Sequence, residues 1–308
     1  MTPAGASTTR NVLLLVNPTA GRGRALRLWP AVDRALRDDG HTTSVHIARS
    51  LTDAERAARA ADSSTIVAVL GGDGFLGAAA AGARESSAVL LPLAGGRGND
   101  NVRRLGLPLD PVVAVGGLAR LDEIVMDLGM VNGRPFFGVV NVGLDGVANE
   151  HSNRSRLNLG PLIYVYGGVR ALFEWRDVAF TLAVDSDDRT FTGWFVAVGN
   201  VGQYGGGMRI CPDALADDGQ LDVVFMGRTP ARAVIATFLR SYKGKHLGHP
   251  RVTQLRGHRV RIAANKPLNV YADGEKVGPL PADVHVLPGA IKVLVPPGSP
   301  VFRPVTVG

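Results

Sequence analysis

The stretch Thr65-Ile66-Val67-Ala68-Val69-Leu70-Gly71-Gly72-Asp73-Gly74 joins a short apolar run to a glycine-rich turn. The apolar run predicts a buried strand, and the small-residue stretch from Gly74 to Arg84 predicts a helix. The turn between them places bare backbone N–H groups at a strand end and in front of a helix, where the helix dipole favours anions. This arrangement predicts a cradle for phosphate oxygens.

Asp73 lies in the middle of this turn and admits two interpretations. A carboxylate beside phosphate-binding amides would repel the ligand unless a cation stood between them, which indicates Mg²⁺ bound with a nucleotide. On spacing alone, the same side chain could equally cap the helix that follows. The residues themselves leave both interpretations open.

Two further glycine-rich turns follow apolar runs. The turn from Asn17 to Gly23 leaves the run that starts at Asn11, and Gly95-Gly96-Arg97-Gly98-Asn99-Asp100 leaves the run Val89–Leu93. A single turn of this kind is most often an ordinary tight turn. Three turns at the carboxyl ends of neighbouring strands favour a ligand site, because ligands bind at that edge in α/β folds. No Walker A loop is present.

The first 130 residues alternate between strand-like and helical stretches, which predicts βαβ units on a parallel sheet. One helix is expected over Arg24–Asp39, and Thr52 with Glu55 has the spacing of a capping box at the start of the next. After about Val131, short strand-like runs separated by turn signals predict a mainly antiparallel β domain. Helical patches at Leu162–Trp175 and Ala231–Tyr242 interrupt it.

A chain of 308 residues suits two domains, at roughly 100–200 residues per domain. We expect a loose tail over residues 1–10, an α/β nucleotide-binding domain over residues 11–130 and a β-rich acceptor domain over residues 131–297. Whether the segment from about 298 to 308 returns to the first domain stays open.

Composition excludes several classes of protein. The 39 glycines follow no repeat and 45% of the residues are hydrophobic, so neither a collagen-like nor a disordered chain fits. The single Cys211 allows no internal disulfide and no cysteine-based zinc site. No stretch approaches the ~18 apolar residues of a membrane span, and residues 1–10 lack the apolar core of a signal peptide, so we expect a cytoplasmic protein. The net charge of +7 would draw the protein toward acidic partners, but a solvated basic surface is the preferred explanation.

Two acidic turns occur in the second half. The segment Leu215-Ala216-Asp217-Asp218-Gly219-Gln220 offers carboxylates and backbone carbonyls around a glycine, which suits a hard cation. Asp273-Gly274-Glu275 stands between two strand-like runs and by itself is typical of a hairpin turn.

Taken together and in order, these motifs resemble those of diacylglycerol kinases. The motifs are Asn17-Pro18 with Gly21, Gly71–Gly74, Gly98–Asp100 followed by Arg103 to Gly106, Gly205–Gly207, Cys211-Pro212 to Asp218-Gly219, and Asp273–Glu275. The resemblance to the bacterial diacylglycerol and lipid kinase catalytic fold, which sphingosine kinases share, extends from about Asn11 to Pro297. The Gly71–Gly74 motif also occurs in NAD kinases, so it would not decide the family alone.

The resemblance implies an ATP- and Mg²⁺-dependent kinase of a lipid hydroxyl, with diacylglycerol converted to phosphatidic acid. It implies a doubly wound α/β domain and a C-terminal, mainly antiparallel β-sandwich domain, with the active site in the cleft between them. The implied nucleotide-site residues are Asn17, Gly71, Gly72, Asp73, Gly74, Gly95, Gly96, Arg97, Gly98, Asn99 and Asp100. Leu215, Asp218 and Gln220 would match the Mg²⁺ site, and Asp273 and Glu275 the acidic pair that carries the general base.

The chain departs from the family pattern at two places. Phe75, Gly77 and Ala78 stand where the family has Thr, Asn and Glu, and Arg97 replaces a hydroxyl residue. Arg97 offers phosphate a charge-assisted contact instead. These departures keep open a nucleotide-binding protein with weak or lost kinase activity, and a kinase of a soluble acceptor such as NAD or a sphingoid-like base is a third interpretation.

The acceptor side is the least readable. Leu162–Trp175, with Arg154, Arg156 and Arg170 nearby, is interpreted either as an acyl-chain groove or membrane-facing patch, or as an ordinary buried helix. His246 and His249 are expected in a solvated basic loop that could steer the protein to the anionic inner face of a membrane. No motif for sequence-specific nucleic-acid binding occurs, and a homodimer is left open.

Overall fold

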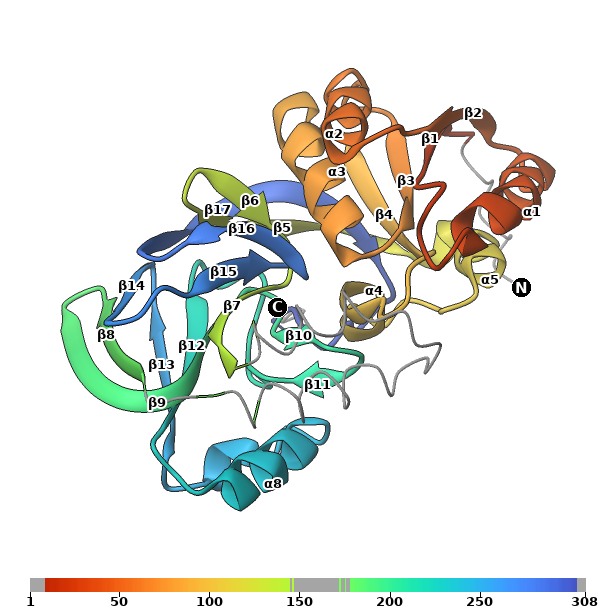
Figure 1. Cartoon of the computed structure of the whole chain (residues 1–308). Coiled ribbons are helices and arrows are strands. Elements are labelled where there is room, and N and C mark those ends of the chain that lie inside the picture. The colour runs from red at the N-terminus through yellow and green to blue at the C-terminus, as the bar shows by residue number, and fades with distance from the viewer. Residues whose placement is uncertain (1–8, 145, 147–171, 173–174, 176–177, 304–308) are drawn as a thin grey trace, which may run out of the picture. The chain divides into compact units, whose positions relative to one another are not determined.

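The computed structural model describes residues 9–144, 146, 172, 175 and 178–303 (Figure 1). The chain divides into two compact units, Met1–Met126 with Ala290–Pro300 and Asp127–Gly289 with Val301–Gly308. The division falls inside two strands, β5 (Asp122–Val131) and β17 (Ala282–Val295). The first unit ends at Met126, a few residues before the boundary expected after residue 130. The C-terminal segment that joins it is Ala290–Pro300, where the sequence suggested about 298–308.

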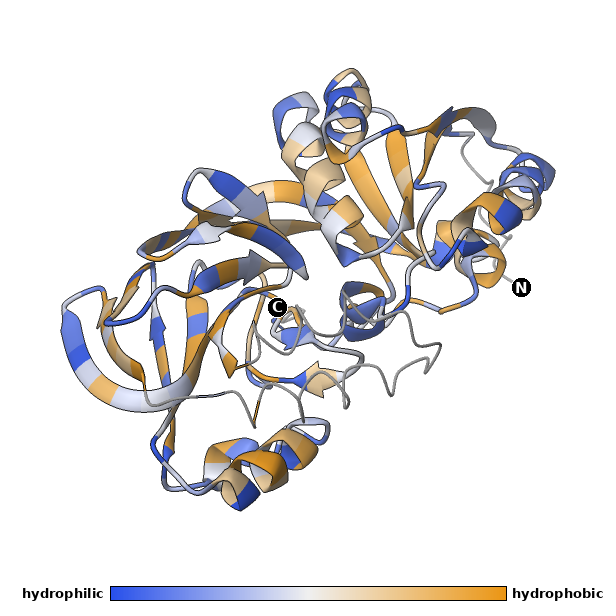
Figure 2. Cartoon of the chain, viewed as in Figure 1, coloured by the Kyte–Doolittle hydropathy of each residue, from blue (hydrophilic) through white to orange (hydrophobic). Residues whose placement is uncertain are grey.

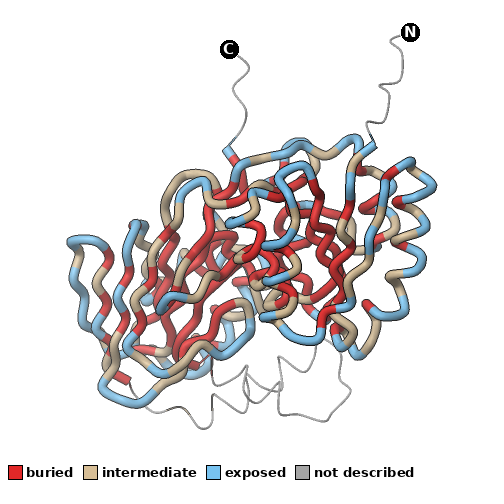
Figure 3. Tube along the Cα trace, turned by 90° about the horizontal axis from the view of Figure 1, so that it is seen from above, coloured by how far each residue is buried: buried red, intermediate tan, exposed pale blue. Residues whose placement is uncertain are grey.

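The first unit contains a parallel sheet in the order β4-β3-β1-β2. Its strands are β1 (Asn11–Val16), β2 (Thr42–Ile47), β3 (Ile66–Gly71) and β4 (Val89–Ala94). The end of β17 adds a further parallel strand beside β4. Every residue of β3 and β4 is buried, as expected of parallel strands covered on both faces (Figure 3).

Helices cover both faces of this sheet, which confirms the doubly wound α/β class. The helices are α1 (Arg24–Asp38), α2 (Leu51–Arg59), α3 (Asp73–Ser86), α4 (Asp100–Arg104) and α5 (Pro111–Val115), followed by a 3₁₀ turn, η1 (Leu118–Arg120). The step from β1 to β2 runs opposite to the steps to β3 and β4, so right-handed crossovers place α1 on one face and α2 with α3 on the other.

The N-terminal cap of α2 differs from the expected capping box. Ser50, in extended conformation, accepts the Asp53 N–H at 3.0 Å through its hydroxyl oxygen. The helix therefore begins at Leu51, and Thr52 lies inside its first turn. The prediction chose the wrong one of two hydroxyl residues, because Ser50-x-x-Asp53 and Thr52-x-x-Glu55 have the same spacing.

The second unit is built from antiparallel strands, as predicted. They are β6 (Arg134–Phe136), β7 (Val139–Gly143), β8 (Val178–Val184), β9 (Asp187–Gly199), β10 (Gln203–Tyr204), β11 (Met208–Arg209), β12 (Leu221–Gly227), β13 (Val252–Gly257), β14 (Arg259–Ala264), β15 (Asn269–Ala272) and β16 (Glu275–Pro279). The last strand, β17, is one continuous strand of 14 residues that passes from the second unit into the first.

Apolar side chains of these strands form two clusters. One includes Phe136, Phe180 and Phe225, and the other includes Phe195 and Val234. Helix α8 (Ala231–Ser241) and a 3₁₀ turn, η2 (His246–Gly248), accompany the second cluster. Figure 2 shows many hydrophobic residues along the strands.

Candidate nucleotide site and acidic loops

The three glycine-rich turns meet at the carboxyl edge of the first unit's sheet. A Cβ at Gly21 would lie 2.6 Å from the Gly95 carbonyl oxygen, and one at Gly96 would lie 2.6 Å from the Gly72 Cα. The Gly95 N–H donates to the Gly71 carbonyl at 2.9 Å. Side chains at Gly21 and Gly96 would force the turns apart, so glycine is required by loop-to-loop contact.

Asp73 is the first residue of α3, and its carboxylate bonds to a different helix. Oδ1 accepts the Asn101 N–H at 3.0 Å, and Oδ2 accepts the Asp100 N–H at 3.2 Å. These N–H groups belong to the first turn of α4, where Asn99, with a φ of 53°, provides no side-chain cap. Asp73 therefore caps α4 across the loops, a role that neither of the two sequence-based interpretations included.

The start of α3 has no side-chain cap. Its N-cap residue is Gly72, which has no side chain that could accept a hydrogen bond from the first turn. Backbone N–H groups at such an end carry partial positive charge and favour an anion. Because the Asp73 carboxylate bonds to α4, the backbone N–H groups from Gly71 to Gly74 keep their affinity for an anion, as the predicted phosphate cradle requires.

The side chain of Asn99 closes the Gly95–Asp100 loop by bonding to Gly96. Asn99 Oδ1 accepts the Gly96 N–H at 2.8 Å, and Asn99 Nδ2 donates to the Gly96 carbonyl at 3.1 Å. Arg103 Nε donates to the Gly98 carbonyl at 3.1 Å. Asn99 thus shapes the loop, whereas Arg97 is exposed and has no hydrogen bond or ion pair with the residues that the structure describes.

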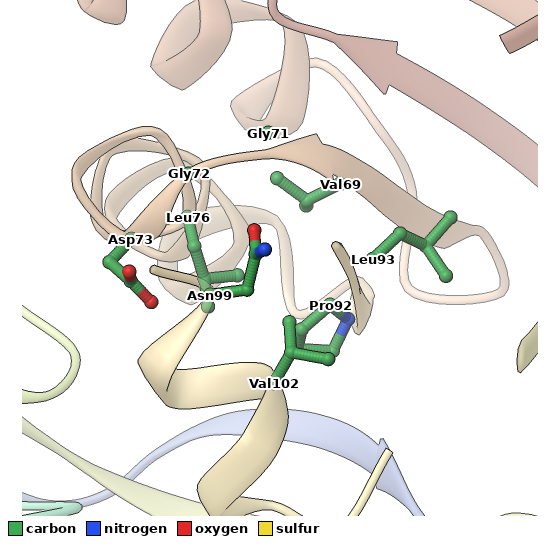
Figure 4. Close-up of a pocket in the computed structure, with 9 residues that line it drawn as sticks. All are labelled: Val69, Gly71, Gly72, Asp73, Leu76, Pro92, Leu93, Asn99 and Val102. Atoms are coloured by element: carbon green, nitrogen blue, oxygen red, sulfur yellow. The ribbon is translucent and has the colours of Figure 1, made fainter. Parts of the chain in front are cut away.

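A small pocket lies between the Gly71 turn and the Gly95–Asp100 loop (Figure 4). It is lined by Val69, Gly71, Gly72, Asp73, Leu76, Pro92, Leu93, Asn99 and Val102. Phe75 does not belong to this lining. Its ring packs under the loop instead, because a Cβ at Gly71 would lie 2.4 Å from Phe75 Cδ1, and Phe75 is only 4% exposed.

Asn17 directly follows β1 and organises the first of the three turns. Its Oδ1 accepts the N–H of Thr19 at 3.1 Å and the Thr19 hydroxyl at 2.9 Å. Its own N–H donates to the Leu70 carbonyl at 3.0 Å. Asn17 therefore ties the first turn to β3, next to the Gly71 turn.

In the second unit, Asp127 holds the loop that contains the predicted metal ligands. Asp127 Oδ2 accepts the Gly219 N–H at 2.7 Å, and Oδ1 accepts the Gly289 N–H at 2.8 Å. The Asp127 N–H donates to the Ala216 carbonyl at 2.7 Å. This buried residue was missed by the sequence analysis, since nothing in a strand sequence marks an aspartate whose partners lie 92 and 162 residues away.

The predicted ligands Leu215, Asp218 and Gln220 belong to one short loop, which turns at Gly219 with a φ of +74°. Asp218 Oδ1 accepts the Gln220 N–H at 3.0 Å. Within the described ranges, no hydrogen bond reaches the carbonyl oxygen of Leu215 or of Gln220. Two open carbonyls and one carboxylate are oxygen ligands of the kind that hard cations take, so the residues fit such an ion.

Negative charge accumulates around this loop. Burial raises the pKa of the Asp127 carboxyl, the N–H groups of Gly289 and Gly219 lower it, and the nearby charges of Asp218 and Asp217 raise it. Burial also raises the pKa of Asp222, against its hydrogen bonds to Arg256 and Gln254. In the described part of the chain, no three His, Cys, Asp or Glu side chains gather as a metal centre. A cation at this loop would thus depend on its carbonyl oxygens.

Asp273 and Glu275 lie in one hairpin but in different surroundings. The Asp273 carboxylate accepts the N–H groups of Phe137, Gly138 and Val139 at 2.6, 2.8 and 3.2 Å. Glu275 begins β16, is exposed, and its carboxylate has no hydrogen bond or ion pair among the described residues. Asp273 therefore fixes the Phe137–Val139 segment, and Glu275 presents the open carboxylate.

Other sequence-based expectations have mixed outcomes. Of the Leu162–Trp175 patch, only Leu172 and Trp175 are described; Trp175 stacks on Trp194 at 6.2 Å, and Arg154, Arg156 and Arg170 lie outside the described residues. The placement of His246 in a solvated loop is wrong. It is fully buried, with Nε2 2.9 Å from the Ile210 carbonyl oxygen. None of the described helices is long and apolar enough to cross a membrane.

Comparisons with known proteins agree with this architecture. Residues 11–131 match the diacylglycerol kinase catalytic domain, and residues 138–295 match the YegS C-terminal NAD kinase beta sandwich-like domain. A crystal structure of a diacylglycerol kinase from Bacillus anthracis superposes with a TM-score of 0.69 at 21% identity, covering 97% of this chain and 99% of that one. At that identity, the superposition shows the fold.

Sequence relatives extend the match. The chain is 31% identical to "Diacylglycerol kinase" of Mycobacterium tuberculosis, over 92% of this chain and 95% of that protein. It is 34% identical to "Probable lipid kinase YegS-like" of Pseudomonas aeruginosa, over 87% and 90% of the two chains. An α/β domain with three converging glycine turns, followed by an antiparallel β domain, defines a class of two-domain phosphotransferases. The chain belongs to the diacylglycerol kinase and YegS-like lipid kinase family.

Proposed function

We propose that this protein transfers the γ-phosphate of ATP to a lipid hydroxyl, and that its acceptor is diacylglycerol, which becomes phosphatidic acid. The observation that carries the proposal is the convergence of three glycine-rich turns at the uncapped start of α3. The name of the relative in Mycobacterium tuberculosis supports diacylglycerol as the acceptor.

The nucleotide groups come from the first unit. N–H groups at the Gly71–Gly74 turn would receive phosphate oxygens, and Arg97, exposed at its loop, would add a charge-assisted contact. Three further residues would hold these turns in shape. The side chains of Asn17 and Asn99 form hydrogen bonds within their own loops, and the Asp100 N–H donates to Asp73. Such positioning and charge neutralisation is what phosphoryl transfer chiefly requires.

Leu215, Asp218 and Gln220 would hold Mg²⁺, the first and third through their carbonyl oxygens. When bound, the ion would offset negative charge in this loop, where Asp127, Asp217 and Asp218 already influence one another. The free carbonyls of Leu215 and Gln220 support this assignment over an interpretation as an ordinary turn.

Glu275 would be the general base and Asp273 a positioning residue. A base must accept the proton of the attacking hydroxyl, and the Glu275 carboxylate is the one of the pair without hydrogen bonds. The acceptor oxygen would attack the γ-phosphorus, the bond to the bridging oxygen of ADP would break, and Glu275 would take the hydroxyl proton. Asp273 would keep its strand ends in register, since three N–H groups already occupy its oxygens.

The alternative is a nucleotide-binding relative with weak or lost kinase activity, which Phe75, Gly77 and Ala78 favour. The buried position of Phe75 counts against it, because the ring lies under Gly71 and outside the pocket lining. A soluble acceptor, NAD or a sphingoid-like base, is the remaining alternative.

The test is an acceptor comparison with labelled ATP and Mg²⁺. Diacylglycerol in mixed micelles, a sphingoid base in the same micelles and NAD in solution are offered separately. We expect label in phosphatidic acid above the level of the Glu275→Gln variant. Label only in NAD or in the sphingoid base would replace the proposed acceptor, and ATP-dependent thermal stabilisation without any labelled product would establish lost activity.

A further inference from the structure

Helix α8 carries an apolar stripe that the fold does not bury. Its buried face, which includes Val234 and Thr237, packs on the second apolar cluster. On the adjoining face, Ile235, Leu239 and Tyr242 are 46%, 66% and 42% exposed. Their spacing of four and then three residues aligns them along one side of the helix. Figure 2 shows hydrophobic and hydrophilic residues alternating around α8.

This stripe is unusual for the protein. Seven large hydrophobic side chains are exposed in the described part of the chain, and three of them form this one stripe. The other four are single residues on α1, β2, α5 and β5: Leu26, Ile47, Val113 and Val125. Isolated exposed hydrophobics are ordinary, whereas an aligned group marks a contact surface.

Cations border the stripe. Arg232, Arg240, Lys243 and Lys245 are exposed, and none has an ion pair among the described residues. Counted at 100° per residue, Arg232 falls directly beside Leu239 on the helix circumference, and Lys243 lies in the turn that follows the helix. The four cations with Ile235, Leu239 and Tyr242 are called here the α8 surface.

Sequence around α8 is basic over a long range. Residues 223–272 contain ten Lys or Arg and no Asp or Glu, although the whole chain has 27 acidic residues. Three of these cations, Arg256, Arg259 and Arg261, are paired with Asp222 or Asp283. The unpaired ones concentrate on the α8 surface, so its charge is not neutralised from within its own segment.

We propose that the α8 surface docks the protein on an anionic lipid bilayer. Helices that lie in the membrane interface combine an apolar face with flanking Lys and Arg, whose stems cover the apolar boundary while their charges reach lipid phosphates. Tyr242, with an apolar ring and a hydroxyl 3.5 Å from the Gly205 carbonyl oxygen, suits the same interface. The inference rests on the proposed function in one respect, since a lipid acceptor resides in a membrane.

Sedimentation of the full chain with vesicles of phosphatidylglycerol and phosphatidylcholine tests the proposal. We expect binding at low salt that weakens as salt rises. Each of Arg240→Gln and Lys243→Gln should lower the partition coefficient about fivefold, the equivalent of about 1 kcal/mol per cation near the surface. The double variant Ile235→Ser/Leu239→Ser should lower it about tenfold or more. Matched controls are Val113→Ser on α5 and Arg34→Glu on α1, both exposed, and both should bind as the wild type does.

Three outcomes would overturn the docking proposal: no binding of the wild type to anionic vesicles, unchanged binding of the α8 variants, or losses with the charge variants alone. The last would indicate a purely electrostatic surface for polyanions. Activity on diacylglycerol in detergent micelles separates this result from the proposed function. Micellar activity without vesicle binding removes the docking role only, and vesicle binding through α8 without any lipid phosphorylation removes the kinase role only.

Discussion

The Asp73 carboxylate accepts the backbone N–H of Asn101 at 3.0 Å, so the first turn of α3 holds the first turn of α4. The two residues lie 28 positions apart and belong to different glycine-rich motifs. The motifs are therefore one structure, in which a carboxylate stabilises a neighbouring loop and leaves the amides of its own helix available.

Replacing Asp73 with Ala should weaken both stability and nucleotide binding. The N–H groups of Asp100 and Asn101 would lose their acceptor, at a cost of about 2 kcal/mol in the free energy of unfolding. Asp110→Ala is the matched control, because Asp110 caps α5 by accepting the Val112 N–H. It should cost about 1 kcal/mol and leave ATP-induced thermal stabilisation unchanged. Equal ATP stabilisation of wild type and Asp73→Ala would contradict this role.

Restoring the family's threonine at position 75 should not improve the enzyme. Phe75 is buried against the Gly71 backbone, so Phe75→Thr leaves a cavity and should lower the free energy of unfolding by about 3 kcal/mol. Phe75→Leu should cost less, since it keeps most of the volume. Urea unfolding and turnover are measured on each. A large gain in turnover by Phe75→Thr at wild-type stability would show that Phe75 suppresses activity, and would favour the alternative of lost kinase activity.

A divalent cation should stabilise the second unit through Asp218. We expect Mg²⁺ to raise the melting temperature of the wild type and to have little effect on Asp218→Asn. Without Mg²⁺, that variant should be at least as stable as the wild type, because the Asp218 charge raises the pKa values of Asp127 and Asp222. Asp188→Asn, an exposed carboxylate on β9, is the control. A full Mg²⁺ response in Asp218→Asn would exclude the loop as the site.

His246 should make the protein sensitive to mild acid. Burial lowers its pKa below the ordinary value, against the Ile210 carbonyl and the charge of Asp213, which raise it. As the pH falls below about 6.5, His246 of the unfolded chain takes up a proton while His246 of the folded chain stays neutral. The free energy of unfolding therefore decreases from that pH down to the lower pKa of the folded state. His246 alone should contribute at most about 1.4 kcal/mol per pH unit to the slope of the unfolding free energy. His246→Gln, which keeps a donor for Ile210, should flatten that slope between pH 7.5 and 5, and an unchanged slope would show that another group titrates.

Local patterns made much of this fold predictable. Each glycine-rich turn sits between an apolar strand and a helix or loop that are its chain neighbours, so strand, turn and helix could be read together. The hairpin at Asp273-Gly274 was predictable for the same reason, and β15 and β16 confirm it. Residues whose partners are remote were not predictable: the role of Asp73 depends on α4, and that of Asp127 on Gly219 and Gly289. The burial of His246 was missed because its sequence neighbours, Lys243 and Lys245, are exposed cations.

The most direct test of the central claim is transfer of labelled γ-phosphate from ATP to diacylglycerol in mixed micelles with Mg²⁺, comparing wild type with Glu275→Gln and Asp273→Asn. We expect labelled phosphatidic acid from the wild type. Glu275→Gln should lose at least 100-fold in turnover, as expected for a general base, with unchanged stability. Asp273→Asn should lose stability together with activity, since an amide cannot accept from three N–H groups as a carboxylate does. Wild-type label no higher than that of Glu275→Gln would show that the protein does not phosphorylate diacylglycerol with Glu275 as the base.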